Sequence, residues 1–329
     1  MISLCMITKN EEQFLETCLN SVKDLVAEII IGDTGSTDKT IEIAKKFGAK
    51  VIDLPWNNNF SEARNAVLAQ ATQPWILVLD GDEMLDQQNH EFIRESIKNP
   101  EAQGYSFVQI TYTNDETLEN FSPVKEDILK KGFKGMISCN IIRLFRNDPS
   151  FRFVGAVHEY IEDSIGKKGK IGITTYPIYH YQELKGTNFF KKKQVEYLKI
   201  YEQHIDTYPN KGRAYRHMGN ICYTFLKDYD RSIAYFQQAL EIKQDARSYL
   251  GLGWCYLQKQ EYTQAEEMFK KGLEVDRQNA TLWLSRGKLY ILMQKPRAAR
   301  TCFENALKLQ PDNQPVKAML DNLNAVLGT

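Results

Sequence analysis

The sequence predicts two different halves: an α/β half with a mainly parallel sheet, followed by an all-α half built from repeats. Apolar runs of strand length alternate with segments of helical spacing up to residue 80. Three β-rich runs then follow without a helix long enough to cross between parallel strands. Beyond residue 186 no run looks like a strand, and glycine recurs every 34 residues.

The first half is expected to begin with strands and helices in alternation. The expected strands are residues 2–8, 27–33, 49–56 and 75–80, and the expected helices are 10–25, 36–48 and 60–71. The strand runs are almost continuously apolar, which is typical of a parallel sheet covered by helices on both faces. We expect Asn10 to cap the first helix, with Gln13 three residues later, and Gly48 to end the second.

The three β-rich runs cover residues 105–113, 138–146 and 151–161. The polar segment from 114 to 135 separates the first from the second and is predicted to be a loop. A loop of this length is unusual in a compact domain and often has a function, so in an enzyme it would be a candidate lid.

Several positions of the second half repeat in register. The repeated glycines, the aromatic residues four positions before them and the later phenylalanines are Gly219, Gly253, Gly287; Tyr215, Tyr249, Trp283; and Phe236, Phe269, Phe303. A period of 34 residues with small and aromatic residues at fixed positions resembles the tetratricopeptide repeat. The first unit has one residue more than the others between its glycine and its second helix.

These patterns divide the chain into four segments. We expect a nucleotide-binding domain over 1–185, a linking helix or half-repeat over 186–209, three repeats over 210–311 and a capping helix over 312–329. A cap is expected because the last repeat of a solenoid otherwise exposes its apolar face.

Composition excludes several classes of protein. The 329 residues contain 42 Lys plus Arg and 42 Asp plus Glu, so no overall charge attracts nucleic acid. None of the six cysteines forms a C-x-x-C pair, so no zinc or redox motif is indicated and reduced thiols are expected. No segment has the ~18 apolar residues of a membrane span, and the first residues do not resemble a signal peptide. We expect a cytoplasmic protein without an integral membrane segment.

Polar side chains gather where the expected strands end. Those that follow the first, second and fourth strands are Thr8, Asn10, Glu11; Asp33; and Asp80, Asp82, Glu83. Ligands of open α/β sheets bind at this edge. Three clustered carboxylates raise one another's pKa unless a cation joins them, and only Arg64 is clearly expected nearby. The sequence therefore favours a Mg²⁺ or Mn²⁺ site, although a solvated acidic turn is the alternative.

Neither G-x-G-x-x-G nor a P-loop motif is present. Residues 1–182 instead resemble a family 2 glycosyltransferase of the GT-A fold, which is Rossmann-like, through "MITKNEE", "IGDTGSTDKT", "NNFSEARN" and "VLDGDE" in the family's order. The later "RLFRN", "VGAVHE" and "YPIYHY" resemble the branch that has C-terminal repeats, which includes bacterial S-glycosyltransferases of glycocin peptides.

The resemblance implies a hexosyltransferase that takes a sugar from a nucleotide-diphosphate donor, by family habit a UDP-sugar, with inversion at the anomeric carbon. The residues that it places at the nucleotide sugar are Thr8, Asn10, Glu11, Asp33, Arg64, Asp80 and Gly81. It places Asp82, and His180 as a further ligand, at Mn²⁺ or Mg²⁺.

Inversion by direct displacement needs a base on the acceptor side of the sugar. We favour Glu159, because the family often uses a carboxylate from this region, with His158 as the next candidate and Asp163 as a third.

Three functions compete. The first is transfer to a peptide or protein docked by the repeats, and the second is transfer to a small or lipid-linked acceptor. In the second case the repeats could bind a second copy of the chain. The third is a scaffold whose nucleotide-binding domain no longer catalyses; the Asp80/Asp82 and His158/Glu159 pairs argue against it. A nucleotidyltransferase is disfavoured, because "MITKNEE" lacks the basic, glycine-rich signature of that class.

Overall fold

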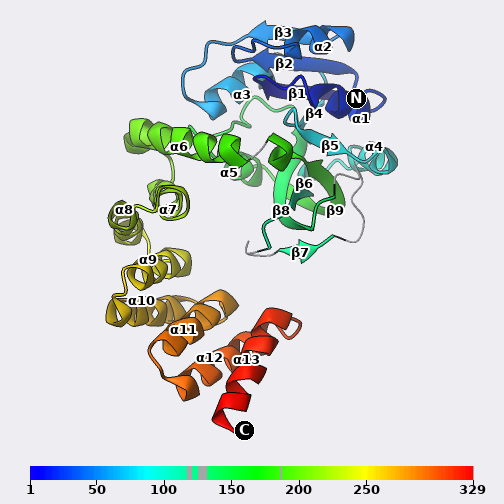
Figure 1. Cartoon of the computed structure of the whole chain (residues 1–329). Helices are drawn as coiled ribbons and strands as arrows, with labels where there is room; N and C mark the ends of the chain where they lie inside the picture. Colours follow the sequence, from blue (N-terminus) through cyan, green and yellow to red (C-terminus); the bar gives the residue numbers. More distant parts are fainter. Residues whose placement is uncertain (117–120, 125–131, 186, 329) are drawn as a thin grey trace. The chain divides into compact units, whose positions relative to one another are not determined.

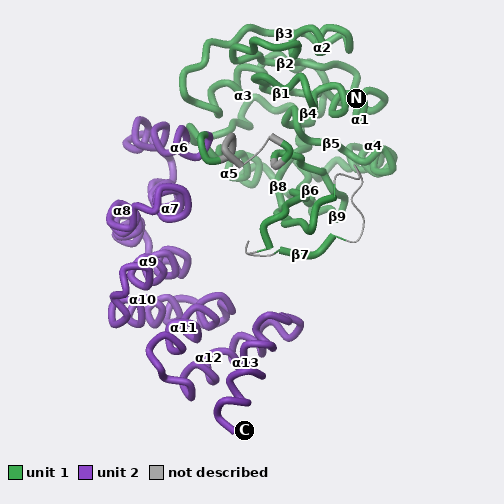
Figure 2. Tube along the Cα trace, viewed as in Figure 1, with its two compact units in different colours: residues 1–192 green, residues 193–329 purple. Residues whose placement is uncertain are grey.

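The computed structural model describes residues 1–116, 121–124, 132–185 and 187–328. The chain forms two compact units, Met1–Lys192 and Lys193–Thr329 (Figure 2). The first is an α/β unit and the second is all-helical, as the sequence predicts. Each unit is described by itself below.

The first unit is built on one mixed sheet with the strand order β3-β2-β1-β4-β8-β6-β9-β5 (Figure 1). The strands are β1 Ile2–Thr8, β2 Glu28–Asp33, β3 Lys50–Asp53, β4 Trp75–Val78, β5 Glu83–Leu85, β6 Ala102–Thr113, β8 Gly135–Arg146 and β9 Lys170–His180, with β7 Ser122–Pro123 paired to β8. Strands β1 to β4 are parallel, as predicted. Strand β8 joins antiparallel to β4 and β6, while β9 runs parallel to β6.

Helices cover both faces of this sheet. Helices α1 Leu15–Val22, α2 Thr40–Lys46 and α4 His90–Ser96 contribute to one core, which includes Leu4 and Met6 of β1. Helices α3 Phe60–Leu68 and α5 Glu162–Gly166 contribute to the other, which includes Cys5 of β1. Successive residues of a strand point to opposite faces, so an almost continuous apolar run supplies both cores at once.

Two expectations for the first unit are wrong. Helix α1 begins at Leu15, and Asn10 does not cap it. Asn10 lies in the left-handed region with φ 57°, and its Oδ1 accepts a hydrogen bond from Thr37 N at 2.8 Å. The run 151–161 is not a strand but forms a single bridge between Val154 and Tyr160. Phe151 and Phe153 of this run are both buried in the second core, which explains their strand-like alternation in the sequence.

The loop predicted over 114–135 is only partly described. Residues 117–120 and 125–131 lie outside the described residues, while Ser122–Pro123 form β7. Its role as a lid stays a prediction.

The second unit consists of helices that pair in sequence. They are the part of α6 Thr187–His204 that follows Lys192, and α7 Lys211–Ile221, α8 Tyr229–Ile242, α9 Ala246–Gln258, α10 Tyr262–Val275, α11 Ala280–Leu292, α12 Pro296–Leu309 and α13 Gln314–Leu327 (Figure 1). Helices α7/α8, α9/α10 and α11/α12 form the three predicted pairs. The limits chosen for the linking and capping helices stay predictions.

The 34-residue period has a steric cause. A Cβ atom at Gly253 would lie 2.2 Å from the ring of Phe269, and one at Gly287 would lie 2.4 Å from the ring of Phe303. A Cβ atom at Gly219 would likewise lie 2.9 Å from the ring of Phe236. The two helices of each pair therefore cross where only glycine leaves room for the aromatic ring.

The extra residue of the first repeat forms a π-helical turn. This turn covers Cys222–Leu226, between α7 and α8. A left-handed residue then precedes the second helix of each pair: Lys227, Gln260 and Gln294. Because a π turn absorbs a one-residue insertion without ending the helix, the repeat keeps its geometry. Within the described part of the chain, no helix combines the length and the apolar character needed to cross a bilayer.

We predict that Gly287→Ala destabilises the repeats, because the new Cβ would overlap the Phe303 ring. Overpacking of this kind costs about 1–3 kcal/mol of unfolding free energy. Guanidinium unfolding followed by circular dichroism measures the loss.

Gly212→Ala is the matched control, since its Cβ would meet nothing nearer than Ile242 at 3.5 Å. Alanine favours a helix over glycine, so this variant should not lose stability. Equal effects of the two substitutions would contradict the steric explanation.

Candidate active site

Asp80 lies between two arginines at the edge of the sheet. Arg64 Nη2 donates to Asp80 Oδ1 at 2.7 Å, and Arg143 Nη2 donates to Asp80 Oδ2 at 3.1 Å. Burial raises the pKa of Asp80, but the two guanidinium groups lower it by more, so that the pKa lies well below its usual range. Asp80 is thus held ionised with both oxygens engaged.

Glu83 is buried and turned inward. Its Oε1 accepts hydrogen bonds from Arg143 Nη2 and Gln109 Nε2, both at 2.5 Å. Its Oε2 accepts from Asp80 N at 2.9 Å, and its own N–H donates to Asp80 O at 3.0 Å. One side-chain contact and one backbone contact with Asp80 therefore close the turn Asp80–Glu83.

Asp82 lies in that turn and faces His180. The distance from His180 Nε2 to Asp82 Oδ1 is 3.5 Å, and both side chains are largely buried. Two further contacts place the imidazole: Glu83 is paired with His180 in the β5–β9 ladder, and Tyr181 N donates to Asp82 O at 3.0 Å. On its other side, His180 Nδ1 lies 3.2 Å from Thr111 Oγ1.

The pKa of His180 reflects these neighbours. Burial lowers it, but the hydrogen bond and the charge of Asp82, followed by the charges of Glu83 and Asp80, raise it more. The net effect is a pKa above the ordinary value for histidine.

Glu159 reaches the same network through Arg64. Arg64 Nε donates to Glu159 Oε1 at 2.5 Å, and no described residue bonds to Glu159 Oε2. The segment that carries Glu159 is fixed to α3 by the neighbouring residue Asn65, which exchanges two hydrogen bonds of 2.9 Å with the backbone of Phe153. Phe60 N, at the start of α3, donates to Ala156 O.

The other two base candidates differ in their surroundings. His158 is half-buried and has φ 49°, a conformation that non-glycine residues rarely adopt. Such strain often accompanies functional sites. Asp163 is exposed in the first turn of α5.

Thr8 and Asp33 end neighbouring strands and are paired in the β1–β2 ladder. Asp33 Oδ2 accepts from the N–H groups of Gly35 and Ser36 at 3.0 and 2.8 Å. By contrast, Asp33 Oδ1 and Thr8 Oγ1 are buried and have no hydrogen-bond partner among the described residues. A buried polar atom without a partner is costly and points to a ligand or ordered water.

The remaining predicted residues surround this position. Asn10 holds the loop after β2, as described above, and Glu11 N donates to Thr40 Oγ1 at 2.7 Å. A Cβ atom at Gly81 would lie 2.7 Å from Glu11 Cγ, so the glycine lets the loops after β1 and β4 approach each other.

The sequence did not reveal how the carboxylates are neutralised. It indicated one cation, whereas the structure adds Arg143, together with Gln109 and Thr111 as hydrogen-bond partners. The available signal was an arginine inside the apolar strand "IIRLFR", because a buried arginine nearly always has an acidic partner.

A divalent metal fits part of this site. Within the described residues, no group of three His, Cys, Asp or Glu side chains is arranged to hold one. Asp82 and His180 do offer one carboxylate and one imidazole nitrogen, the latter oriented from behind by Thr111. Mg²⁺ and Mn²⁺ often take only one or two protein ligands and complete their shell with water and phosphate oxygens.

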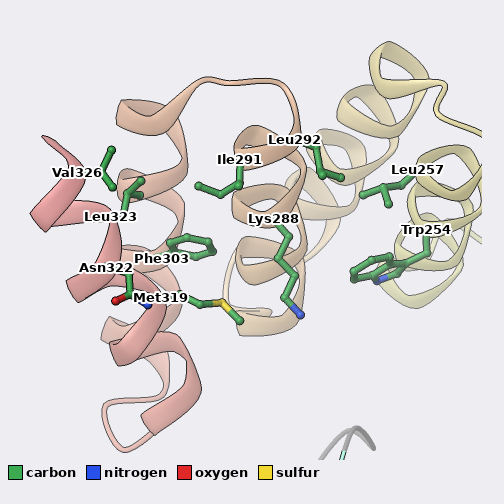
Figure 3. A pocket seen from close by; sticks show the side chains of 10 residues that line it. All are labelled: Trp254, Leu257, Lys288, Ile291, Leu292, Phe303, Met319, Asn322, Leu323 and Val326. Atoms are coloured by element: carbon green, nitrogen blue, oxygen red, sulfur yellow. The ribbon is translucent and has the colours of Figure 1, made fainter.

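A separate cavity of about 630 Å³ lies in the second unit. Its lining side chains come from α9, α11, α12 and α13 (Figure 3): Trp254, Leu257, Lys288, Ile291, Leu292, Phe303, Met319, Asn322, Leu323 and Val326. Trp254, Lys288 and Asn322 occupy equivalent positions 34 residues apart. Lys288 is the one charged residue in this lining, and its Nζ lies 5.8 Å from the centre of the Trp254 ring.

We predict that Asp82→Asn lowers the pKa of His180 in metal-free protein, because Asp82 contributes most of what raises it. A raised pKa in the folded state stabilises the protein fully below about pH 6.5, and this stabilisation is lost as the pH rises through the folded-state pKa. NMR titration of the His180 ring proton measures the shift, with Asp86→Asn as the control. An unchanged pKa would show that Asp82 does not contact His180 in solution.

Both halves of the chain match known protein families. Residues 3–152 match Glycosyl transferase family 2, and residues 226–289 and 280–313 match tetratricopeptide repeat families. An uncharacterized glycosyltransferase of Rickettsia typhi is 30% identical over 205 residues, which cover 59% of this chain and 67% of that protein.

Other relatives are longer than the matched part. A TPR repeat-containing protein of Synechococcus elongatus is 40% identical over 164 residues, 50% of this chain but 36% of that protein. The glycosyltransferase SunS of Bacillus subtilis is 26% identical over 73% of this chain and 53% of its own length. Among solved structures, the Arabidopsis OM64 TPR domain is similar at 23% identity and a TM-score of 0.33, over 35% of this chain and 94% of that domain. The family matches and the Rickettsia relative together show that the chain belongs to glycosyl transferase family 2 and has C-terminal tetratricopeptide repeats.

Proposed function

We propose that the protein is a metal-dependent inverting glycosyltransferase that moves a sugar from a UDP-sugar to a side chain of a peptide or protein. The observation that carries this proposal is the buried, unpartnered pair Asp33 Oδ1 and Thr8 Oγ1 at the strand edge where ligands of α/β sheets bind. The family membership supports glycosyl transfer, and the site supports the donor and metal assignments.

On the donor side, Asp33 accepts a hydrogen bond from the nucleobase. Its Oδ2 is already held by two backbone N–H groups, so Oδ1 is pre-oriented toward the ligand. Uracil N3–H is a donor suited to a carboxylate oxygen. Thr8 adds a hydroxyl beside it, while Asn10, Glu11 and Gly81 shape the loops around the nucleoside.

On the phosphate side, Asp82 and His180 hold Mn²⁺ or Mg²⁺. A metal bound there neutralises charge that develops on the leaving diphosphate. Asp80 is not a metal ligand in this proposal, because Arg64 and Arg143 occupy both of its oxygens.

On the acceptor side, Glu159 is the proposed base. Arg64 fixes its Oε1, which leaves Oε2 to take the acceptor proton. His158 is the second candidate because of its strained backbone, and exposed Asp163 is the third.

The repeats support a polypeptide acceptor. Their cavity is lined almost entirely by apolar side chains, and Ile291, Leu292 and Val326 are 45%, 51% and 80% exposed. Apolar surface of this kind commonly binds another protein. A small or lipid-linked acceptor is the alternative; in that case a second copy of the chain could cover this surface. The homodimer and the cytoplasmic location stay predictions.

Calorimetric binding of UDP and of a panel of nucleotide sugars, with Mn²⁺ and with chelator, tests the donor and the metal together. We predict metal-dependent binding of UDP and its loss in Asp82→Ala. Asp86→Ala, which changes a nearby aspartate outside the network, should bind as the wild type does. Binding without metal would remove the metal role, and no binding by folded protein would favour the scaffold function.

Glu159→Gln should retain UDP binding and lower turnover by about 100-fold or more, because the amide cannot accept the acceptor proton. Glu162→Gln, at an exposed position three residues later, is the control. Turnover of a panel of acceptors gives the readout, since the natural acceptor must be found first. Near-normal turnover of Glu159→Gln would indicate that His158 or Asp163 is the base instead.

A further inference from the structure

We infer that Arg143 is a positioning residue, which fixes the turn Asp80–Glu83 and through it the direction of Asp82. The inference depends on the proposed function, because it assigns Asp82 to a metal. Arg143 lies on β8, far from the turn in sequence, and this role would make it one of the residues that shape the donor site.

Glu83 is buried together with Arg143. Its side chain is 0% exposed, and that of Arg143 is 4% exposed. Burying a carboxylate this far from water is costly unless an opposite charge and hydrogen bonds compensate for the lost hydration. Arg143 is the cation in contact with it, and Gln109 supplies a neutral donor to the same oxygen.

Glu83 holds the turn through two contacts with Asp80. Its Oε2 binds the N–H of Asp80, and its own N–H binds the carbonyl of Asp80. The first contact requires the side chain of Glu83 to stay inward, which in turn requires Arg143; the second is a bond between backbone groups. Asp82 lies between the two ends of the turn, so its direction depends on the first contact in addition to its own contacts with Tyr181 and His180.

The planar shape of the Arg143 guanidinium matters as well as its charge. One nitrogen, Nη2, contacts Asp80 Oδ2 and Glu83 Oε1 together, and so joins the first and last residues of the turn. A planar guanidinium holds two carboxylates at defined angles, whereas an ammonium acts as a flexible point charge. Lysine at this position should therefore preserve charge but not direction.

The loss of the Arg143 charge and the loss of its positioning role have opposite effects on the affinity for a cation, so the two can be told apart. Removing a positive charge near a metal site should tighten the binding of a cation. Misdirecting Asp82 should weaken it. Weaker Mn²⁺ binding by Arg143→Met would therefore report lost position.

The experiment measures the Mn²⁺ dissociation constant of the full chain by electron paramagnetic resonance of free Mn²⁺, with and without UDP. We expect at least tenfold weaker binding for Arg143→Met and an intermediate loss for Arg143→Lys. Arg143→Met/Glu83→Gln has the net charge of the wild type and no buried carboxylate to neutralise. Because glutamine can still accept from Asp80 N, this double variant should recover most of the affinity.

Arg146→Met is the matched control from the same strand. Arg146 donates three hydrogen bonds, all to backbone carbonyls, those of Ala102, Asn99 and Pro100. Its loss should lower the thermal midpoint and leave the Mn²⁺ constant unchanged.

Two results would overturn the inference while the metal site stands: folded Arg143→Met that binds Mn²⁺ as tightly as the wild type or more tightly, or a loss that Arg146→Met shares. If Arg143→Met does not fold, Arg143→Lys decides. Weaker Mn²⁺ binding by folded Arg143→Lys supports the inference, and affinity equal to that of the wild type contradicts it. Wild-type protein that binds no Mn²⁺ would instead contradict the proposed metal site itself.

Discussion

The edge of the sheet depends on the neutralisation of clustered carboxylates by two arginines. Asp80, Glu83 and Glu159 each contact a guanidinium group, from Arg64 on α3 or Arg143 on β8. Buried charge is tolerated only when it is paired and hydrogen-bonded. Elements that are distant along the chain are therefore held together by a requirement of charge, in addition to their apolar packing.

The charges around this edge do not balance. Four carboxylates, those of Asp80, Asp82, Glu83 and Glu159, are opposed by two guanidinium groups. Protonation of His180, which its raised pKa favours, reduces the excess only in part in metal-free protein. A divalent cation beside neutral His180 would offset the excess instead and would also attract the diphosphate of a donor. The negative excess and the proposed metal are thus two aspects of the same electrostatics.

Local patterns predicted the elements well, and long-range pairings much less. The four parallel strands and the three helix pairs follow from periodicity, because the burial of each element sets its own pattern. The role of Asn10 could not be seen in the same way, since its partner is Thr37 of another loop. Arg143 was missed for a similar reason: 60 residues separate it from Glu83. The strand expected over 151–161 was wrong because Phe151 and Phe153 alternate as in a strand but are buried in the second core without joining the sheet.

Arg64 has a further consequence for the site as a whole. A single rigid guanidinium binds Glu159 through Nε and Asp80 through Nη2, at 2.5 and 2.7 Å. Its atoms lie in one plane, so the two carboxylates cannot move independently without breaking one of these bonds. Any displacement of Asp80 when a charged ligand binds must therefore reach Glu159, either as a shift in its position or as a change in the field that it experiences. In the proposed enzyme, Asp80 lies on the donor side and Glu159 on the acceptor side, which makes Arg64 the physical connection between donor binding and the readiness of the base.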